Sequence, residues 1–347
     1  MGWLFVILLN LNNTSAAPSY AEDLIRITDG RVWIENANCA TFDGNLSALK
    51  TWTESTSASC TIQNRTVKES LCSADIHDCL PEHVKKYQGV KAEFNGPNCW
   101  NLALVMKGLL PHLRKSSPEE MTFYMNSDLC HKLDVSEAPQ PGDIGAIRTK
   151  NCNPSESSQS NSSCEIHGFI YVSPDLVYSK NSEAKESPYA LQSRSVVYQY
   201  YDAEDSKKTV DFYRCSSITE FLRENAARIN PDLIQAFDAI KTIDCYTQRT
   251  AISNNVFAPI QIQHLLAAAE ILRAYTKSAK HTAKTKEEKF AMEALELRQR
   301  VLSEQFYYFL YKMASHSNVN AIQRGFPMRR LGQIFLDFDD ENMDAGF

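Results

Sequence analysis

The spacing of hydrophobic and polar positions changes along this chain, and each change marks a different kind of structure. Residues 25–70 are rich in Thr, Ser, Asn, Val and Ile, with breaks at Asp29-Gly30 and Asp43-Gly44. Short runs of such residues separated by Asp-Gly steps are typical of strands joined by hairpins. We therefore predict a small β-rich module over residues 18–75.

Apolar residues adopt helical spacing from Cys99 to Pro111, where the proline ends the predicted helix. Short runs of Val, Ile, Tyr and Phe follow this helix, and each predicts a strand. The five predicted strands are Gly142–Ile147, His167–Val172, Leu176–Tyr178, Val196–Tyr201 and Thr209–Tyr213. A helix followed by an antiparallel sheet indicates the α+β class.

A polar segment interrupts the predicted sheet. Residues 151–163 are nearly all Asn, Ser, Glu, Gln and Pro, and Cys152 and Cys164 stand at the two ends of this region. We predict a surface insertion that a disulfide ties at its base.

The last third of the chain is predicted to be helical. Its three helix starts each carry a capping-box pair or an Asn-Pro step, at Ser217 with Glu220, at Asn230-Pro231, and at Thr285 with Glu288. The third start opens the longest predicted helix, which runs to about Ser315 and is followed by an acidic tail.

Composition excludes some classes of protein. Of the 347 residues, 43% are hydrophobic and 22% charged, which is ordinary for a globular chain that buries a core. Acidic residues exceed basic ones by 42 to 36, giving a net charge of -6, and no run of Lys and Arg is present. We therefore expect no nucleic-acid partner.

The N-terminus has the features of an export signal. The apolar run Trp3–Leu11 has about half of the ~20 residues that a membrane-spanning helix needs, and small residues follow it as far as Ala17. We predict that residues 1–17 are a secretory signal peptide and that the protein is secreted or periplasmic, with no transmembrane anchor after cleavage. The alternative is a short buried helix or strand at this end.

Ten cysteines favour an oxidising compartment, and because no CxxC pair occurs they do not suggest a zinc or thioredoxin-like site. An even number allows five disulfides with Cys99 as one partner. If Cys99 is instead a free nucleophile, proximity suggests four bridges and leaves Cys130 over, although sequence does not fix the connectivity. Those four candidate bridges are Cys39–Cys60, Cys72–Cys79, Cys152–Cys164 and Cys215–Cys245.

One cysteine lies where a helix begins. Gly96 and Pro97 turn the chain immediately before the predicted helix, which places Cys99 in its first turn. Unpaired backbone N–H groups and the helix dipole stabilise a thiolate there, so we predict a lowered pKa and a nucleophilic role. Of the eight histidines, His167 alone opens a clear apolar strand. We expect this imidazole to face the helix start as general base.

Three motifs in this order resemble the NlpC-type endopeptidases and their CHAP relatives, papain-fold enzymes that hydrolyse peptide bonds in bacterial cell walls. The motifs are Asn98-Cys99-Trp100-Asn101, Pro141-Gly142-Asp143-Ile144 and His167-Gly168-Phe169-Ile170-Tyr171. The resemblance covers residues 87–215. It implies a papain-like core, Cys99 as nucleophile, His167 as base, a peptidoglycan stem peptide as substrate, and no metal or organic cofactor.

The resemblance also implies a third residue that orients the base and a tyrosine that helps to bind the tetrahedral intermediate. At the position of the usual second His this chain has Ser179, and Asn181 follows two residues later on the same strand face. We favour Asn181, because its side-chain oxygen accepts from an imidazole N–H, with Ser179 as the alternative. Tyr87 is the candidate for the upstream tyrosine.

The sequence thus predicts four segments and one main activity. Residues 76–215 form a papain-like catalytic domain, and residues 216–347 form a helical domain with an acidic tail. The predicted protein is an exported cysteine hydrolase of amide bonds. Two alternatives stay open: a disulfide-stabilised, non-catalytic binding protein on the same fold, and an enzyme that transfers the acyl group to an amine. The sequence does not indicate an oligomeric state.

Overall fold

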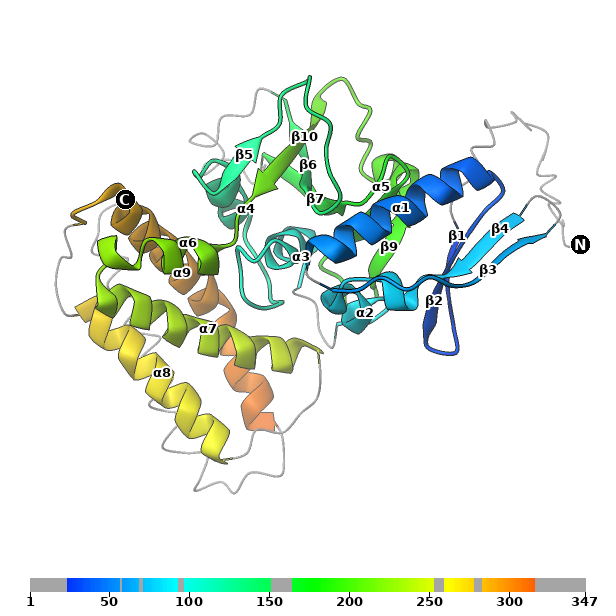
Figure 1. The fold of residues 1–347 in the computed structure, drawn as a ribbon. Coiled ribbons are helices and arrows are strands. Elements are labelled where there is room, and N and C mark those ends of the chain that lie inside the picture. The colour runs from blue at the N-terminus through cyan, green and yellow to red at the C-terminus, as the bar shows by residue number, and fades with distance from the viewer. Residues whose placement is uncertain are drawn as a thin grey trace, which may run out of the picture.

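The computed structural model describes residues 24–56, 58–68, 71–92, 97–150, 164–252, 259–277 and 283–315. These residues form a mixed α+β fold with two antiparallel sheets (Figure 1). The smaller sheet has the strand order β1-β2-β4-β3 and the larger one the order β5-β10-β6-β7-β8-β9. The predicted signal peptide, the 151–163 insertion and the acidic tail lie outside the described residues.

The smaller sheet begins with the hairpin of β1 (Leu24–Thr28) and β2 (Arg31–Asn36). Its turn is Asp29-Gly30, as the sequence predicts, and both residues have positive φ angles of 51° and 73°. β4 (Leu71–Asp75) pairs with β2, and β3 (Gln63–Lys68) forms the exposed edge.

The prediction of a second hairpin at Asp43-Gly44 is wrong, because that stretch lies within α1 (Cys39–Ser55). The side chain of Asn38 caps this helix by accepting hydrogen bonds from the N–H groups of its first turn. The residues that it buries against the sheet recur at helical spacing, at Phe42, Leu46, Leu49, Trp52 and Thr53. The polar residues between them therefore cover the solvent face of a helix.

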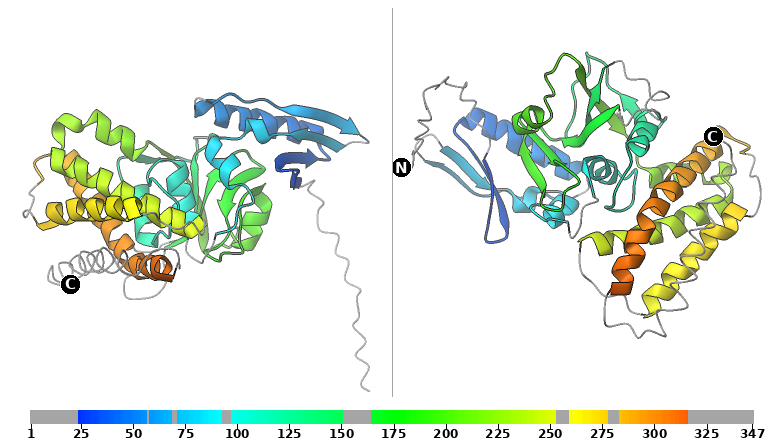
Figure 2. Two further views of the ribbon diagram at one scale, coloured as in Figure 1. Left: turned by 90° about the horizontal axis from the view of Figure 1, so that it is seen from below. Right: turned by 180° about the vertical axis from the view of Figure 1, so that it is seen from behind.

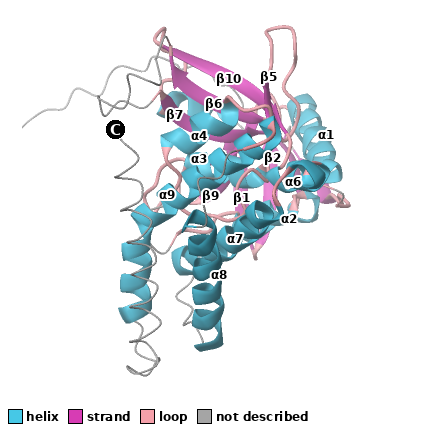
Figure 3. Ribbon diagram, turned by 90° about the vertical axis from the view of Figure 1, so that its left-hand side faces the viewer, coloured by secondary structure: helices cyan, strands magenta, loops and turns pink. Residues whose placement is uncertain are grey.

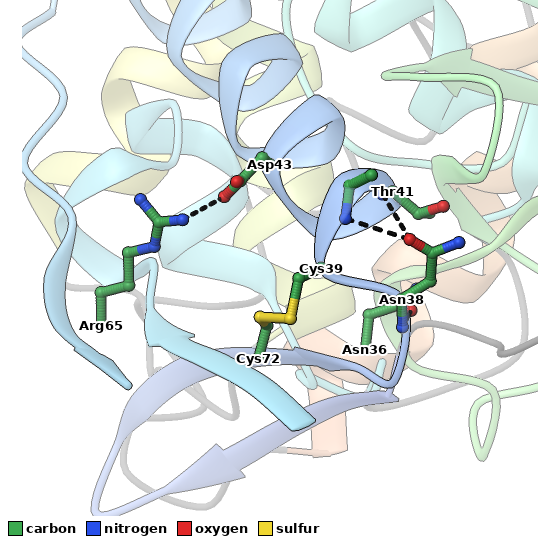
Figure 4. Close-up of a disulfide and its surroundings, with 8 residues drawn as sticks. Asn36, Asn38, Cys39, Thr41, Asp43, Arg65 and Cys72 are labelled. Atoms are coloured by element: carbon green, nitrogen blue, oxygen red, sulfur yellow. Dashed lines mark hydrogen bonds and ion pairs between the residues drawn. A yellow bond between two sulfur atoms is a disulfide. The ribbon is translucent and has the colours of Figure 1, made fainter. Parts of the chain in front are cut away.

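The disulfides also differ from the pairs that proximity suggested. Cys39 bonds to Cys72 and ties the start of α1 to β4, beside an ion pair of 2.6 Å between Arg65 and Asp43 (Figure 4). The other two bridges for which both partners are described are Cys60–Cys79 and Cys130–Cys215. Cys164 is disulfide-bonded as well, whereas Cys152 lies outside the described residues. The pairs Cys39–Cys60, Cys72–Cys79 and Cys215–Cys245 do not occur.

The larger sheet contains four of the five predicted strands, as β6 (Ile144–Thr149), β7 (Glu165–Tyr171), β8 (Leu176–Lys180) and β10 (Lys208–Cys215). The short strand β5 (Cys130–Lys132) and β9 (Tyr189–Ser193) were not predicted. The prediction of a strand over 196–201 is wrong, because α5 (Arg194–Tyr200) occupies that region. Of this helix only Val197 is buried, so its apolar residues follow no alternating pattern.

Helices cover both faces of the larger sheet. α3 (Cys99–Met106) and α4 (Pro118–Met125) pack against β7 on one face (Figure 3). Val197 of α5 packs on the other face with Ile147, Phe169 and Val177. A short 3-10 turn (His77–Cys79) and α2 (Glu82–Tyr87) connect the smaller sheet to α3. Apolar side chains from both sheets belong to one continuous buried cluster, with Val32 and Ile34 from the smaller sheet and Ile170 and Tyr178 from the larger one.

The C-terminal part is helical, as the sequence predicts, and lies at the opposite end of the molecule from the smaller sheet (Figure 2). The Ser217 hydroxyl caps α6 (Ile218–Glu224) by accepting from the Glu220 N–H. A 3-10 turn (Ala226–Arg228) leads to three long helices: α7 (Pro231–Ile252), α8 (Pro259–Lys277) and α9 (Lys286–Ser315). In the described part of the chain, no helix combines the length and apolar character needed to cross a membrane.

A buried charge cluster joins this helical part to the core. Arg114 makes ion pairs of 2.6 Å with Glu120 of α4 and 2.8 Å with Asp244 of α7, and all three side chains are inaccessible to solvent. Nearby, Arg298 of α9 hydrogen bonds to the Tyr124 hydroxyl at 3.0 Å. The guanidinium groups compensate the buried carboxylates, so the junction depends on all partners being present.

Candidate active site around Cys99

Cys99 is a free, buried thiol in the first turn of α3. The Asn98 side chain caps the helix by accepting from the Asn101 N–H at 3.1 Å and donates to the Ser116 carbonyl at 2.8 Å. The Asn101 amide in turn accepts from the Arg114 N–H at 2.9 Å. The two asparagines of the Asn98–Asn101 motif therefore fix both the helix start and the loop that follows the helix.

The backbone around the thiol is arranged as the sequence predicts. The pKa of the thiol, however, is raised and not lowered as the sequence predicts. N–H groups of Gly168, Trp100 and Cys99 itself hydrogen bond to the sulfur, and each lowers the pKa. Burial outweighs them and raises the pKa of Cys99 from 9.0 to about 11. Cys99 is only 6% exposed, so a thiolate there loses its hydration. The resting group is a neutral thiol.

The sulfur occupies a place where the sheet opens. The ladder between β7 and β8 contains the pairs Ile170–Tyr178 and Tyr171–Val177 and does not extend to Gly168. Along a strand, successive backbone N–H groups point alternately to the two neighbouring strands. The N–H of Tyr171 donates to the Asp143 carbonyl beside β6, so the N–H of Gly168, three residues earlier, points toward β8. That N–H donates to the Cys99 sulfur instead of to a strand carbonyl.

His167 lies beside this opening, but its ring is on the other side of β7. A Cβ placed on Gly168 would contact Ala103 of α3 at 3.5 Å, so the side chain of the preceding residue projects to the opposite face. There the imidazole stacks on Tyr201, with ring centroids 3.9 Å apart and planes at 19°. Neither ring nitrogen has a hydrogen-bond partner among the described residues.

The expected hydrogen bond between Cys99 and His167 is therefore not formed in this structure. His167 is fully buried, and desolvation lowers its pKa from 6.5 to about 3. The resting state thus pairs a neutral thiol with a neutral imidazole, because burial disfavours both charged forms. A thiolate–imidazolium pair requires that this region admit water or substrate.

Asn181 and Ser179 form a polar network of their own instead of orienting His167. The Asn181 side-chain oxygen accepts from the Ser179 hydroxyl at 3.0 Å and from the Gln192 amide at 3.0 Å. The Asn181 amide donates back to the Gln192 oxygen at 2.9 Å. The Tyr201 hydroxyl donates to the Asn181 backbone carbonyl. The expected hydrogen bond from the imidazole N–H to the side-chain oxygen of Asn181 or Ser179 is absent from the described contacts.

Tyr87 ends α2 and belongs to a group of buried tyrosines. Its ring centroid is 5.8 Å from that of Tyr189 on β9. Burial raises the pKa of Tyr178, and the hydroxyls of Tyr189 and Tyr87 raise it further. Within the described ranges the hydroxyls of Tyr178 and Tyr189 have no hydrogen-bond partner. Buried hydroxyl groups without partners are uncommon and mark this face of the sheet as polar in an otherwise apolar core.

Lys180 is the charged residue of this site that the sequence prediction did not include. It is fully buried near the end of β8, and its ammonium donates to the carbonyls of Ser182 at 2.5 Å and Ala184 at 2.7 Å. Burial lowers the pKa of Lys180 to about 8, while the nearby Cys99 raises it. The sequence signal that could have indicated Lys180 is its position in the strand Leu176–Lys180, where it occupies the same face as the apolar residues Leu176 and Tyr178.

The described ranges contain no group of three or more His, Cys, Asp or Glu side chains placed to hold a metal ion. Comparisons with models of protein families, with curated proteins and with solved structures found no match to this chain.

Proposed function

We propose that this protein is an exported cysteine hydrolase that cleaves amide bonds with Cys99 as its nucleophile. The observation that supports this most directly is the state of that thiol. The chain forms bridges at Cys39–Cys72, Cys60–Cys79 and Cys130–Cys215, whereas Cys99 is kept reduced at a capped helix start. A free thiol that receives several backbone N–H hydrogen bonds has the surroundings that nucleophilic cysteines use.

The reaction would proceed by acyl transfer. The thiol loses its proton to a base, and the sulfur attacks the amide carbonyl, forming an S–C bond. The backbone N–H groups of Cys99 and Trp100 that face the sulfur are suited to stabilise the oxyanion. The C–N bond then breaks as the amine takes up the proton, and water hydrolyses the thioester. His167 is our candidate for the base, since both of its ring nitrogens are unengaged among the described residues. Because its ring lies on the other face of β7 from the sulfur, this role requires that the ring move or that water carry the proton between the two groups.

The site as described is closed, so substrate access requires movement. Cys99 and His167 are both buried, and Tyr201 covers the imidazole. Displacing Tyr201 would expose the ring and release the Asn181 carbonyl to which its hydroxyl donates. We place the displacement of Tyr201 before the chemical step, because hydration brings the pKa values of Cys99 and His167 toward each other.

The resemblance of the motifs to NlpC-type enzymes supplies the substrate class. The stem peptides of peptidoglycan are peptide amides outside the cytoplasm, where a disulfide-bonded protein persists. The papain-like character of the core is part of the same proposal.

A second candidate is a non-catalytic extracellular binding protein on this fold. The observation that favours it is the pair of pKa shifts in opposite directions, to about 11 for the thiol and about 3 for the imidazole, with no hydrogen bond between the thiol and the imidazole. A degenerate site that has become part of the core would have these properties.

Digestion of purified peptidoglycan distinguishes the two. The oxidised wild-type protein is incubated with sacculi, and the released peptides are identified by mass spectrometry. We expect new amine and carboxyl ends, their loss in Cys99→Ala, and their retention in the matched control Cys245→Ala, since Cys245 is the other free cysteine among the described residues. Binding of sacculi without cleavage by all three proteins would support the second candidate. Products that carry an added amine would indicate acyl exchange instead of hydrolysis.

A further inference from the structure

The thiol of Cys99 has a charged neighbour on its own side of the sheet. Lys180 pairs with Tyr189 in the β8–β9 ladder, and opposite residues of an antiparallel pair project to the same face. Tyr189 belongs to the buried cluster that contains Leu102 and Ala103 of α3. The side chain of Lys180 therefore lies on the α3 face, the same face as Cys99 and the opposite face from His167.

The strand register places this lysine opposite the residue whose N–H donates to the sulfur. Continuing the Ile170–Tyr178 pairing by two residues brings Gly168 opposite Lys180, at the point where β7 and β8 separate. Gly168 is the residue whose N–H donates to the Cys99 sulfur. The ammonium and the thiol consequently interact electrostatically across this opening, each favouring the charged form of the other.

The ammonium is held in place by the backbone. Its hydrogen bonds to the Ser182 and Ala184 carbonyls fix it within the turn after β8, and the Tyr189 ring lies 6.0 Å from it. Burying a lysine without an anion is costly, and here the carbonyls compensate only part of its lost hydration. A thiolate at Cys99 would supply the missing counter-charge.

We propose that Lys180 is a positioning residue that acts through Cys99, stabilising the thiolate by its fixed positive charge when the site opens. This inference rests on the proposed function for its role in catalysis, although the interaction itself can be measured without it. The nucleophile would then be activated from the α3 face by the lysine, while His167 exchanges protons from the α5 face.

Other charged groups near Lys180 do not replace this partner. Glu183 and Glu186 follow in the β8–β9 connection and raise the pKa of the lysine less than Cys99 does. Glu183 also makes an ion pair of 3.3 Å with Lys115. Tyr189 on β9 and Tyr201 after α5 are neutral groups whose pKa values burial raises. Lys180 is charged below about pH 8, so it should favour the Cys99 thiolate below that pH.

The test is the pH dependence of alkylation at Cys99 in the full chain. Variants are made in a Cys245→Ser background, and iodoacetamide labelling of Cys99 is followed by peptide mapping. Lys180→Met removes the charge with little change of volume, Lys180→Arg keeps it, and Lys107→Met is the matched control. Lys107 is also a partly buried lysine with a lowered pKa, but it lies at the far end of α3 near Asp143 and Arg214.

We expect Lys180→Met to slow labelling below about pH 8, by about tenfold for each pKa unit by which loss of the charge raises the pKa of the thiol. Lys107→Met should match the parent. Lys180→Arg should match the parent below about pH 8 and exceed it above, because arginine stays charged there. If Lys180→Met does not fold, the Lys180→Arg profile above about pH 8 decides alone. Superimposed profiles for the parent and the Lys180 variants would overturn the proposal.

These outcomes separate the two proposals. A slowed Lys180→Met with no hydrolysis of sacculi by the wild type refutes the proposed function and leaves the Lys180–Cys99 interaction established. Hydrolysis that depends on Cys99, with unchanged labelling in Lys180→Met, refutes the role of the lysine alone.

Discussion

The buried thiol makes a direct prediction about its own reactivity. Burial raises the pKa of Cys99 from 9.0 to about 11, and unfolding the chain removes that burial. A difference of two pKa units corresponds to about a hundredfold fewer thiolate groups at any pH below the lower value. Native Cys99 should therefore react with iodoacetamide about a hundred times more slowly than in the unfolded chain. Its exposure of 6% restricts access further, so this factor is a lower bound.

The assay compares labelling rates with and without concentrated urea, at about pH 8 and with no reductant, so that the disulfides stay intact. Peptide mapping reports Cys99 and Cys245 separately. Cys245 is the internal control, because it is a free cysteine that is only partly buried. Native rates for Cys99 equal to those in urea would refute the reasoning, since they would mean that the site is open and that the thiol ionises as readily as in the unfolded chain.

Three further substitutions test other parts of the structure. In Gly168→Ala the added Cβ would meet a methionine methyl at 3.3 Å and α3 at 3.5 Å; we expect a loss of about 1–3 kcal/mol in urea unfolding and faster native labelling of the thiol, and unchanged stability would contradict the close packing. The pKa of His167 is about 3 in the folded protein and 6.5 in the unfolded chain, so between about pH 3 and pH 6.5 the unfolded chain binds one more proton than the folded protein. Stability should therefore fall by at most about 1.4 kcal/mol per unit as pH drops through that window, and His167→Phe should flatten this slope. Arg114→Leu leaves Glu120 and Asp244 as buried carboxylates without their cation and should cost about 3–5 kcal/mol in urea unfolding, whereas a change below about 1 kcal/mol would show that the cluster is hydrated.

Local signals in the sequence predicted those elements whose ends are set by neighbouring residues. The capping pair Ser217 and Glu220 marks the start of α6, and Thr285 with Glu288 marks that of α9, because a side-chain oxygen there accepts from a backbone N–H three residues on. Asn98 likewise caps α3 beside the free thiol. Such hydrogen bonds involve only a few consecutive residues, so no tertiary contact is needed to infer them.

Elements that depend on distant contacts were mispredicted. The Asp-Gly step within α1 predicts a hairpin turn, whereas in the structure Phe42 and Leu49 bury one face of a helix on the smaller sheet. The Val and Tyr residues of α5 predict a strand, because both favour strands, whereas in the structure they form a helix that buries Val197 alone against the sheet. In both cases packing outweighed local preference.

The cysteines show the same division. Their number and dispersion favour disulfides, and three bridges are present among the described pairs. Which cysteines pair depends on where α1, β4 and the turn after β4 meet, so proximity along the chain gave Cys39–Cys60 where the structure has Cys39–Cys72. A disulfide requires Cα atoms within a few ångströms, and only the tertiary fold sets that distance.

For the site, the sequence by itself determined that a reduced thiol could stand at the head of a capped helix, with a His-led strand to follow. Only the tertiary structure decided that the imidazole of His167 and the sulfur of Cys99 approach β7 from opposite faces, and that Lys180 shares the face of the sulfur. The physical reason is the two-residue repeat of a strand, in which adjacent side chains project to opposite faces, together with desolvation, which depends on every element packed around the group.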